Sequence, residues 1–192
     1  MSKKVKKKKS PAVNAVTVRK CGQCSVCCTS LLIDTPELAK QAGTSCKHLA
    51  QTSGCSIYET RPEVCKSWKC GWLQLDKLTP QLRPDRSKVL IIINPQPGVT
   101  YQIQPIDEDS ITSLLDDDVM LFIRNATLTG LPVAISVPTR TGYCSYVQLI
   151  HTLVKDVLDD KIAFRSRLGE LIQHASNQLT DRRPEIIHVE AV

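Results

Sequence analysis

Long apolar runs are missing from this sequence of 192 residues. The longest strongly apolar stretches, residues 89–93 and 119–123, fall far short of the roughly 20 residues that a membrane-spanning helix needs. A signal peptide would need an apolar core of about 7–15 residues after its charges, and residues 10–18 are too polar and too short for one. We therefore expect a cytoplasmic protein with no membrane span, in which thiols stay reduced.

Two further absences argue against classes of function. No glycine-rich strand-to-helix turn is present, so the sequence does not indicate a site for a nucleotide-like cofactor. The formal charge of +6 comes entirely from the lysines of residues 3–9, and residues 10–192 are formally neutral. A nucleic-acid binder would spread basic residues over its folded surface, so we expect only weak contacts with nucleic acid, made by this lysine arm.

Cysteine, by contrast, is concentrated in one stretch. Eight of the nine cysteines lie between residues 21 and 70, beginning with the pattern C-x2-C-x2-C-C. In a reducing compartment such crowding indicates a metal site rather than a disulfide framework. A C-x2-C pair lets two thiolates reach one ion from a tight turn, and zinc and iron both take thiolate ligands. The predicted ligands are Cys21, Cys24, Cys27, Cys28, Cys46, Cys55, Cys65 and Cys70.

The spacing leaves the grouping of these ligands open. Eight thiolates could close two tetrahedral zinc sites, or four could hold an iron–sulfur cluster while the others bind zinc or nothing. Cys27 and Cys28 are adjacent and cannot easily point at one ion in regular structure, so one of them serves a second ion or stays a packed thiol. His48, two residues after Cys46, is either a ligand or a hydrogen-bonded neighbour of the site.

Several residues around the cysteines have expected supporting roles. Residues 10–88 carry a net positive charge, and cationic surroundings favour ionised thiolates. Single lysines such as Lys47 are nevertheless expected to be solvated. Arg61, fixed before Pro62, is expected to donate to a thiolate or a backbone carbonyl and hold its loop in place. The isolated Cys144 is expected to be a small buried apolar residue.

Two helices are predicted among the cysteines. The first begins near Asp34, with Pro36 in its first turn, and ends at Gly43. The second begins with a capping box formed by Thr60 and Glu63.

The second helix places Cys65 in its first turns, where the backbone amides favour a thiolate. On a continuous helix Cys65 and Cys70 would point about 140° apart, so either the helix breaks near Lys69 or the two residues bind different ions. Aromatic side chains are expected to cover the site and exclude water, namely Tyr58, Trp68 and Trp72.

After residue 87 the sequence alternates between strand and helix signals. The predicted strands are 88–94, 99–106, 131–137 and, at an edge, 185–191, with a turn at 95–98. The predicted helices are 110–129 and 146–174, the second capped by Ser145.

The expected fold class is α+β, with a small cysteine-rich metal-bound module packed on a small mixed sheet with two main helices. Residues 1–18 should form a basic disordered arm, residues 19–87 the metal-binding module with its connector, and residues 88–192 the α+β half with a C-terminal helix. The module has few large apolar residues, so bound metal would supply folding energy on the order of 10 kcal/mol.

Several motifs within residues 19–150 carry a family resemblance. They are Cys-Gly-Gln-Cys-Ser-Val-Cys-Cys at 21–28, Pro36-Glu37-Leu38, Cys46-Lys-His-Leu49, Cys55-Ser-Ile-Tyr58, Arg61-Pro62-Glu-Val-Cys65, Cys70-Gly-Trp72 and Leu82-Arg-Pro-Asp-Arg86. This set resembles the CxxCxxCC (YkgJ-type) cysteine-cluster family. The resemblance implies chelation of zinc or iron, without a settled reaction.

Three functions are compatible with these features. The favoured one is a metal-binding protein whose zinc or iron site is structural and presents a surface to a protein partner of unknown identity. The second is an iron–sulfur redox or protein-modifying enzyme, distantly similar to flagellin lysine N-methylase, which carries a similar cysteine cluster. The third is a zinc-ribbon nucleic-acid binder, which the neutral body of the chain disfavours.

Overall fold

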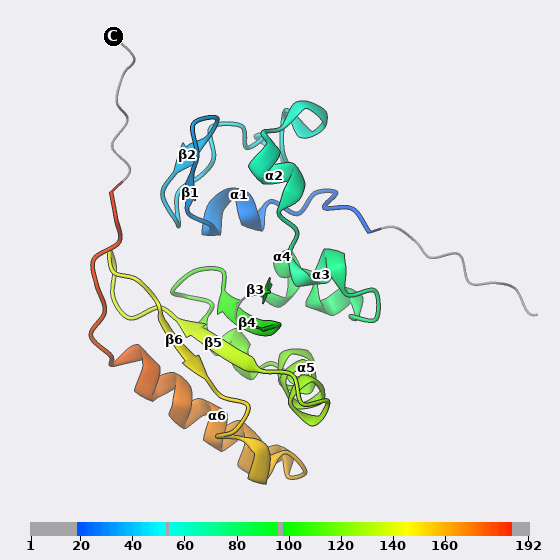
Figure 1. Ribbon diagram of the computed structural model, residues 1–192, viewed down its shortest axis with the longest axis vertical. Coiled ribbons are helices and arrows are strands. Elements are labelled where there is room, and N and C mark those ends of the chain that lie inside the picture. Colours follow the sequence, from blue (N-terminus) through cyan, green and yellow to red (C-terminus); the bar gives the residue numbers. More distant parts are fainter. Residues whose placement is uncertain (1–18, 53, 96–97, 186–192) are drawn as a thin grey trace, which may run out of the picture.

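The computed structural model describes residues 19–52, 54–95 and 98–185. A mixed four-stranded sheet has the order β3-β4-β5-β6, with β4 and β5 parallel and the other neighbours antiparallel (Figure 1). The strands are β3 (Val89–Asn94), β4 (Thr100–Pro105), β5 (Val133–Val137) and β6 (Tyr146–Leu149). The strands predicted at 88–94, 99–106 and 131–137 are therefore confirmed.

Two helices pack against this sheet. They are α5 (Asp117–Leu128), which connects β4 to β5, and α6 (Lys161–Ser176), which follows β6. Alternate strand residues face the helices because side chains alternate along a strand. Ile103 and Ile135 of the sheet are fully buried in one core with Ile123 and Leu168 of the helices. The α+β class is confirmed.

Residues 19–87, which we call the cysteine module, form short elements joined by turns. The helices are α1 (Val26–Ser30), α2 (Glu63–Ser67), α3 (Gly71–Gln74) and α4 (Pro84–Ser87). A hairpin consists of β1 (Ile33–Asp34) and β2 (Ala39–Lys40). Single 3-10 turns lie at Tyr58–Thr60 and Pro80–Leu82 in the module, and at Ile111–Leu115 and Lys155–Val157 beyond it.

The helix predicted from Asp34 to Gly43 is wrong, because these residues form the β1–β2 hairpin. Thr35 and Leu38 exchange two backbone hydrogen bonds, of 3.1 and 3.2 Å, which close a tight turn between the strands. The Thr35 hydroxyl also donates to the Leu38 carbonyl at 3.0 Å. Pro36 therefore acts as a turn residue rather than as the first residue of a helix.

The capping box predicted at Thr60 and Glu63 is also wrong. Thr60 belongs to a 3-10 turn, and the amide of Glu63 donates instead to the Glu37 carboxylate at 3.0 Å. The cap thus comes from the hairpin, far away in sequence. Helix α2 ends at Ser67 and α3 begins at Gly71. The helix break near Lys69, which was one of the two explanations offered for Cys65 and Cys70, is therefore present.

The helices predicted in the second half are shorter than expected. The segment 110–129 divides at Asp116, whose backbone is extended, into a 3-10 turn and α5. The segment 146–174 begins as strand β6, and α6 starts only at Lys161, where the Asp160 side chain accepts hydrogen bonds from two helical amides. Burial alternates along Tyr146–Leu149, which is the period of a strand rather than of a helix.

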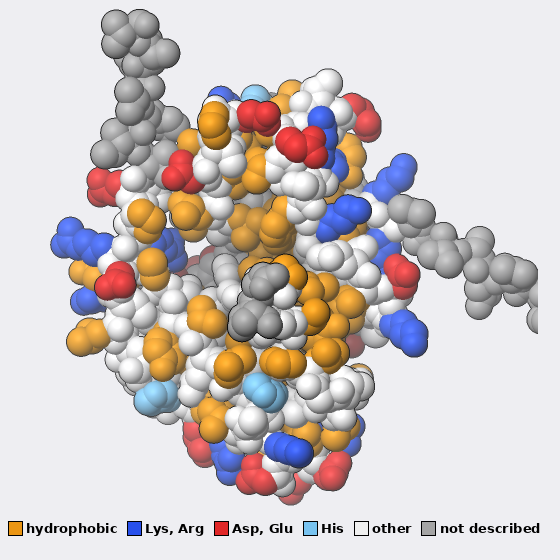
Figure 2. Space-filling view, in the orientation of Figure 1, with side chains coloured by type: hydrophobic (Ala, Val, Ile, Leu, Met, Phe, Trp, Pro, Cys, Tyr) orange, Lys and Arg blue, Asp and Glu red, His pale blue; other side chains and the backbone are white. Residues whose placement is uncertain are grey.

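The cysteine module packs against the edge strand β3. Leu90 points away from the main core and is buried with Val26 and Cys70 of the module. Gly71, at the start of α3, lies directly against Ile91. Hydrophobic side chains gather across the middle of the molecule, between the upper and lower parts of the view in Figure 2.

Some predictions fall outside the described residues: the arm 1–18, the centre of the turn 95–98 and nearly all of the edge strand 185–191. Within the described ranges, no helix is both long and apolar enough to cross a bilayer.

Replacing Gly71 by alanine should destabilise the fold by about 1–3 kcal/mol, the usual cost of overpacking a close contact. The added β-carbon would lie 2.6 Å from Ile91 Cγ2 and 3.1 Å from the Ile91 carbonyl oxygen, so the strand or the helix must shift. Urea unfolding of the Gly71→Ala variant measures the loss.

The matched control is Gly169→Ala in α6, where an added β-carbon meets nothing within 4 Å. It should leave stability unchanged or raise it by about 0.5–1 kcal/mol, because alanine is the better helix former. Equal unfolding free energies for the two variants would contradict the proposed tight packing of α3 on β3.

Candidate metal centre

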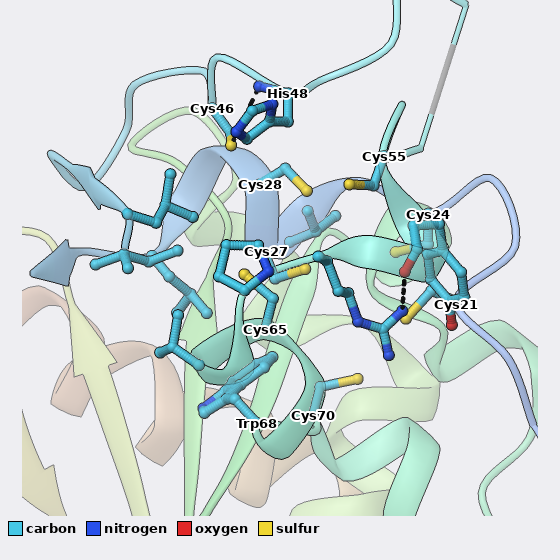
Figure 3. Close-up of a pocket in the computed structure, with 18 of the residues that line it drawn as sticks. Cys21, Cys24, Cys27, Cys28, Cys46, His48, Cys55, Cys65, Trp68 and Cys70 are labelled. Carbon is cyan, nitrogen blue, oxygen red and sulfur yellow. Dashed lines mark hydrogen bonds between the residues drawn. The ribbon is translucent and has the colours of Figure 1, made fainter. Parts of the chain in front are cut away.

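All eight predicted cysteine ligands and His48 line one cavity of about 200 Å³, which we call the thiol cavity. They come from the turn before α1, from α1, from the loop between β2 and α2, and from the segment α2–α3. Figure 3 shows them around the cavity, with Cys46 toward the top of the view and Cys70 toward the bottom. Both ends of the cysteine-rich stretch therefore meet at one place.

The local structure explains how several thiols reach the cavity. Gly22 has a positive φ of 58°, which allows a turn in which the Cys24 amide donates to the Cys21 carbonyl at 3.0 Å. This is the tight turn expected of a C-x2-C pair. Farther along, the Cys46 amide donates to the Cys28 carbonyl at 2.8 Å and ties the loop after β2 to α1.

The ninth cysteine stands apart. All nine are free thiols, but Cys144 lines a separate cleft of about 800 Å³. Cys144 is half-buried, so the expectation of a buried apolar residue is wrong. It provides a thiol outside the candidate site.

Apolar side chains complete the wall of the thiol cavity. They include Val26, Leu31, Leu38, Ile57, Val64 and Leu90, and the predicted aromatic cover of Tyr58, Trp68 and Trp72 also lines it. Burial disfavours the charged thiolate and raises the pKa of Cys24, Cys65 and Cys70. In the absence of metal these thiols keep their protons at neutral pH, and a metal ion that binds the sulfurs would displace these protons.

The adjacent residues Cys27 and Cys28 differ in protonation. A hydrogen bond between their side chains raises the pKa of Cys27 and lowers the pKa of Cys28 to about 7. Burial opposes the ionisation of Cys28, whereas the positive charge of Lys40 favours it. The pair therefore shares one proton near neutral pH, with the negative charge on Cys28.

Lys40 is a residue of the site that the sequence reasoning did not identify. Its side chain is only 7% exposed. The Nζ atom donates to the carbonyls of Thr29 and Gln41, each at 3.0 Å, and to the carbonyl of Leu31. The net positive charge of residues 10–88 was the available signal, but placing Lys40 beside the thiols depends on the hairpin that the sequence did not predict.

Two buried N–H groups beside the thiols have no partner among the described residues: Arg61 Nε and Trp72 Nε1. The Arg61 guanidinium stacks on the Tyr58 ring at 4.0 Å and donates to the Tyr58 carbonyl at 3.5 Å, which agrees with its expected role in holding its loop. A buried donor without an acceptor costs about 1–3 kcal/mol. Both residues line the thiol cavity, where ionised sulfur would be an acceptor.

His48 contacts the site through its backbone, because its amide donates to Cys46 Sγ at 3.4 Å (Figure 3). In the part of the chain that the structure describes, no three side chains of His, Cys, Asp or Glu converge as a ready metal site. The thiols surround the cavity rather than meeting at one point, so side chains would have to turn inward to bind an ion. Metal ligation stays a prediction.

Comparisons with protein-family models, curated proteins and solved structures gave no match. The resemblance to the CxxCxxCC family rests on its motifs and stays a prediction.

In metal-free protein, Cys28 should react with iodoacetamide faster than the other cavity thiols at pH 7. Because its pKa is about 7, the thiolate fraction should be nearly complete at pH 9 and should fall steeply below pH 7. Peptide mass spectrometry after timed alkylation gives the rate at each pH.

The Lys40→Met variant should move the Cys28 alkylation profile to higher pH, since it removes the favourable positive charge. Lys47→Met, at an exposed lysine of the same module, is the control and should leave the profile unchanged. A Cys28 profile that matches that of Cys65 would contradict the lowered pKa.

Proposed function

We propose that the protein binds zinc or iron through the thiol cavity and that the metal has a structural role. The observation that carries this proposal is that eight free thiols from separate elements line one apolar cavity. Thiolates are soft ligands that favour zinc and iron–sulfur centres over the hard cations calcium and magnesium. A reducing compartment, as expected for a cytoplasmic protein, would keep these thiols available.

The small apolar cluster of the cysteine module supports a structural role. Among the described residues, only Val26, Cys70 and Leu90 are buried in this cluster, and Leu90 belongs to the sheet. A structural zinc contributes on the order of 10 kcal/mol to folding, because its site does not exist in the unfolded chain. Bound metal would therefore supply stability that the module's own packing does not.

The charges around the cavity also suit bound thiolates. Lys40, Arg61 and Arg83 lie close enough to the thiols for their pKa values to respond to thiolate charge. Several thiolates around one divalent ion leave a net negative charge, and neighbouring cations stabilise it.

An iron–sulfur redox function is the second candidate, and the unpartnered N–H groups of Arg61 and Trp72 favour it. Hydrogen bonds to cluster sulfurs are one of the means by which proteins set the reduction potential. Colour and acid-labile sulfide in the purified protein would favour this candidate over zinc.

Protein purified without oxygen should contain stoichiometric zinc or iron, and Cys24→Ser should lower both metal content and stability. We expect the free energy of unfolding to fall by about 4 kcal/mol or more, a size typical of the loss of a metal site. Metal analysis and the visible spectrum give the metal, and chemical unfolding gives the stability.

Cys144→Ser is the matched control, because Cys144 is a free thiol outside the thiol cavity. It should keep the metal content of the wild type. Wild-type protein without bound metal, or wild-type metal content in Cys24→Ser, would refute the proposed function.

A further inference from the structure

Resting on the proposed metal function, we infer that the thiol cavity holds two separate ions, each bound by four thiolates. The first group of ligands is Cys21, Cys24, Cys27 and Cys70, and the second group is Cys28, Cys46, Cys55 and Cys65. Four thiolates around one ion is a closed coordination that structural zinc takes. The adjacent residues Cys27 and Cys28 are thus divided between the two sites.

The first group gathers on the side of the cavity next to the sheet. The turn at Gly22 brings Cys21 and Cys24 together, and Cys24 packs with Cys70 in the apolar cluster that includes Leu90. Cys21, Cys24 and Cys70 therefore lie on one side of the cavity.

The second group gathers around the loop that follows β2. The Cys46 amide bonds to the Cys28 carbonyl, and a bridge between Leu49 and Cys55 returns the loop to the same region. Figure 3 shows Cys28 and Cys55 with their sulfurs toward one another and Cys46 nearby. Cys65, in the helix α2 that follows this loop, supplies the fourth thiol of the second group.

Cys27 and Cys28 form the junction between the groups. Successive residues of a helix point about 100° apart, so two adjacent thiols of α1 cannot approach one ion from the same direction. Cys28 is tied through its carbonyl to Cys46 of the second group, which leaves Cys27 for the first group. Assigning one thiol to each site lets both side chains keep the directions that the helix gives them.

Zinc content of purified double variants tests the assignment. Two matched pairs, Cys24→Ser/Cys70→Ser and Cys46→Ser/Cys55→Ser, each remove two ligands from one site. A crossed pair, Cys24→Ser/Cys55→Ser, removes one ligand from each. After the same challenge with the chelator EDTA, we expect two ions per chain in the wild type, one in each matched pair and none in the crossed pair.

A second measurement needs no variant and covers the case in which a double variant does not fold. Metal-free wild-type protein receives one equivalent of zinc and is alkylated, and chains with four protected thiols are sequenced by mass spectrometry. We expect the four protected thiols of any one chain to come from a single group.

The outcomes separate the two proposals. Wild-type protein that binds no metal overturns the proposed function together with this inference. If the wild-type protein binds metal and both matched pairs remain folded but lose all of it, the two-site assignment alone is overturned. Chains in which Cys24 and Cys55 are protected together at one equivalent would overturn the assignment in the same way.

Discussion

The contact between α3 and the edge strand β3 fixes the position on which the thiol cavity depends. Gly71 comes so close to Ile91 that no side chain larger than hydrogen fits between them. Cys70 directly precedes Gly71, so this contact also sets where its thiol lies. Leu90, the neighbouring residue of β3, is 1% exposed and shares an apolar cluster with Cys70. One strand therefore contributes to the main core and to the wall of the cavity.

Within the cavity, burial and positive charge oppose one another. The apolar wall raises the pKa of several thiols, whereas the ammonium of Lys40 favours a thiolate at Cys28. Lys40 reaches this place because its Nζ atom bonds to carbonyls at the C-terminal end of α1, where the helix dipole favours a cation. These two hydrogen bonds therefore secure the hairpin to the end of α1 and place a positive charge beside the thiols.

The sequence predicted the parts of this fold that follow from local patterns. The strand from Val89 is a continuous apolar run bounded by Ser and Pro, and the cysteine spacing identified eight residues that line one cavity. The hairpin at Thr35 was missed because proline after a capping residue is common in turns and in helix starts alike. The sequence did not predict tertiary contacts, such as the cap that Glu37 provides for α2 or the grouping of the thiols.

The two proposed ions would have unequal structural roles. The first group includes Cys70, which continues directly into α3 and through it contacts the sheet. An ion there would connect the start of the cysteine module to the main core. The second group includes Cys46 and Cys55, which lie in the long loop between β2 and α2. Because the other two ligands of this group come from α1 and α2, an ion in the second site would join the loop to these helices, while the first ion would fix the module against β3.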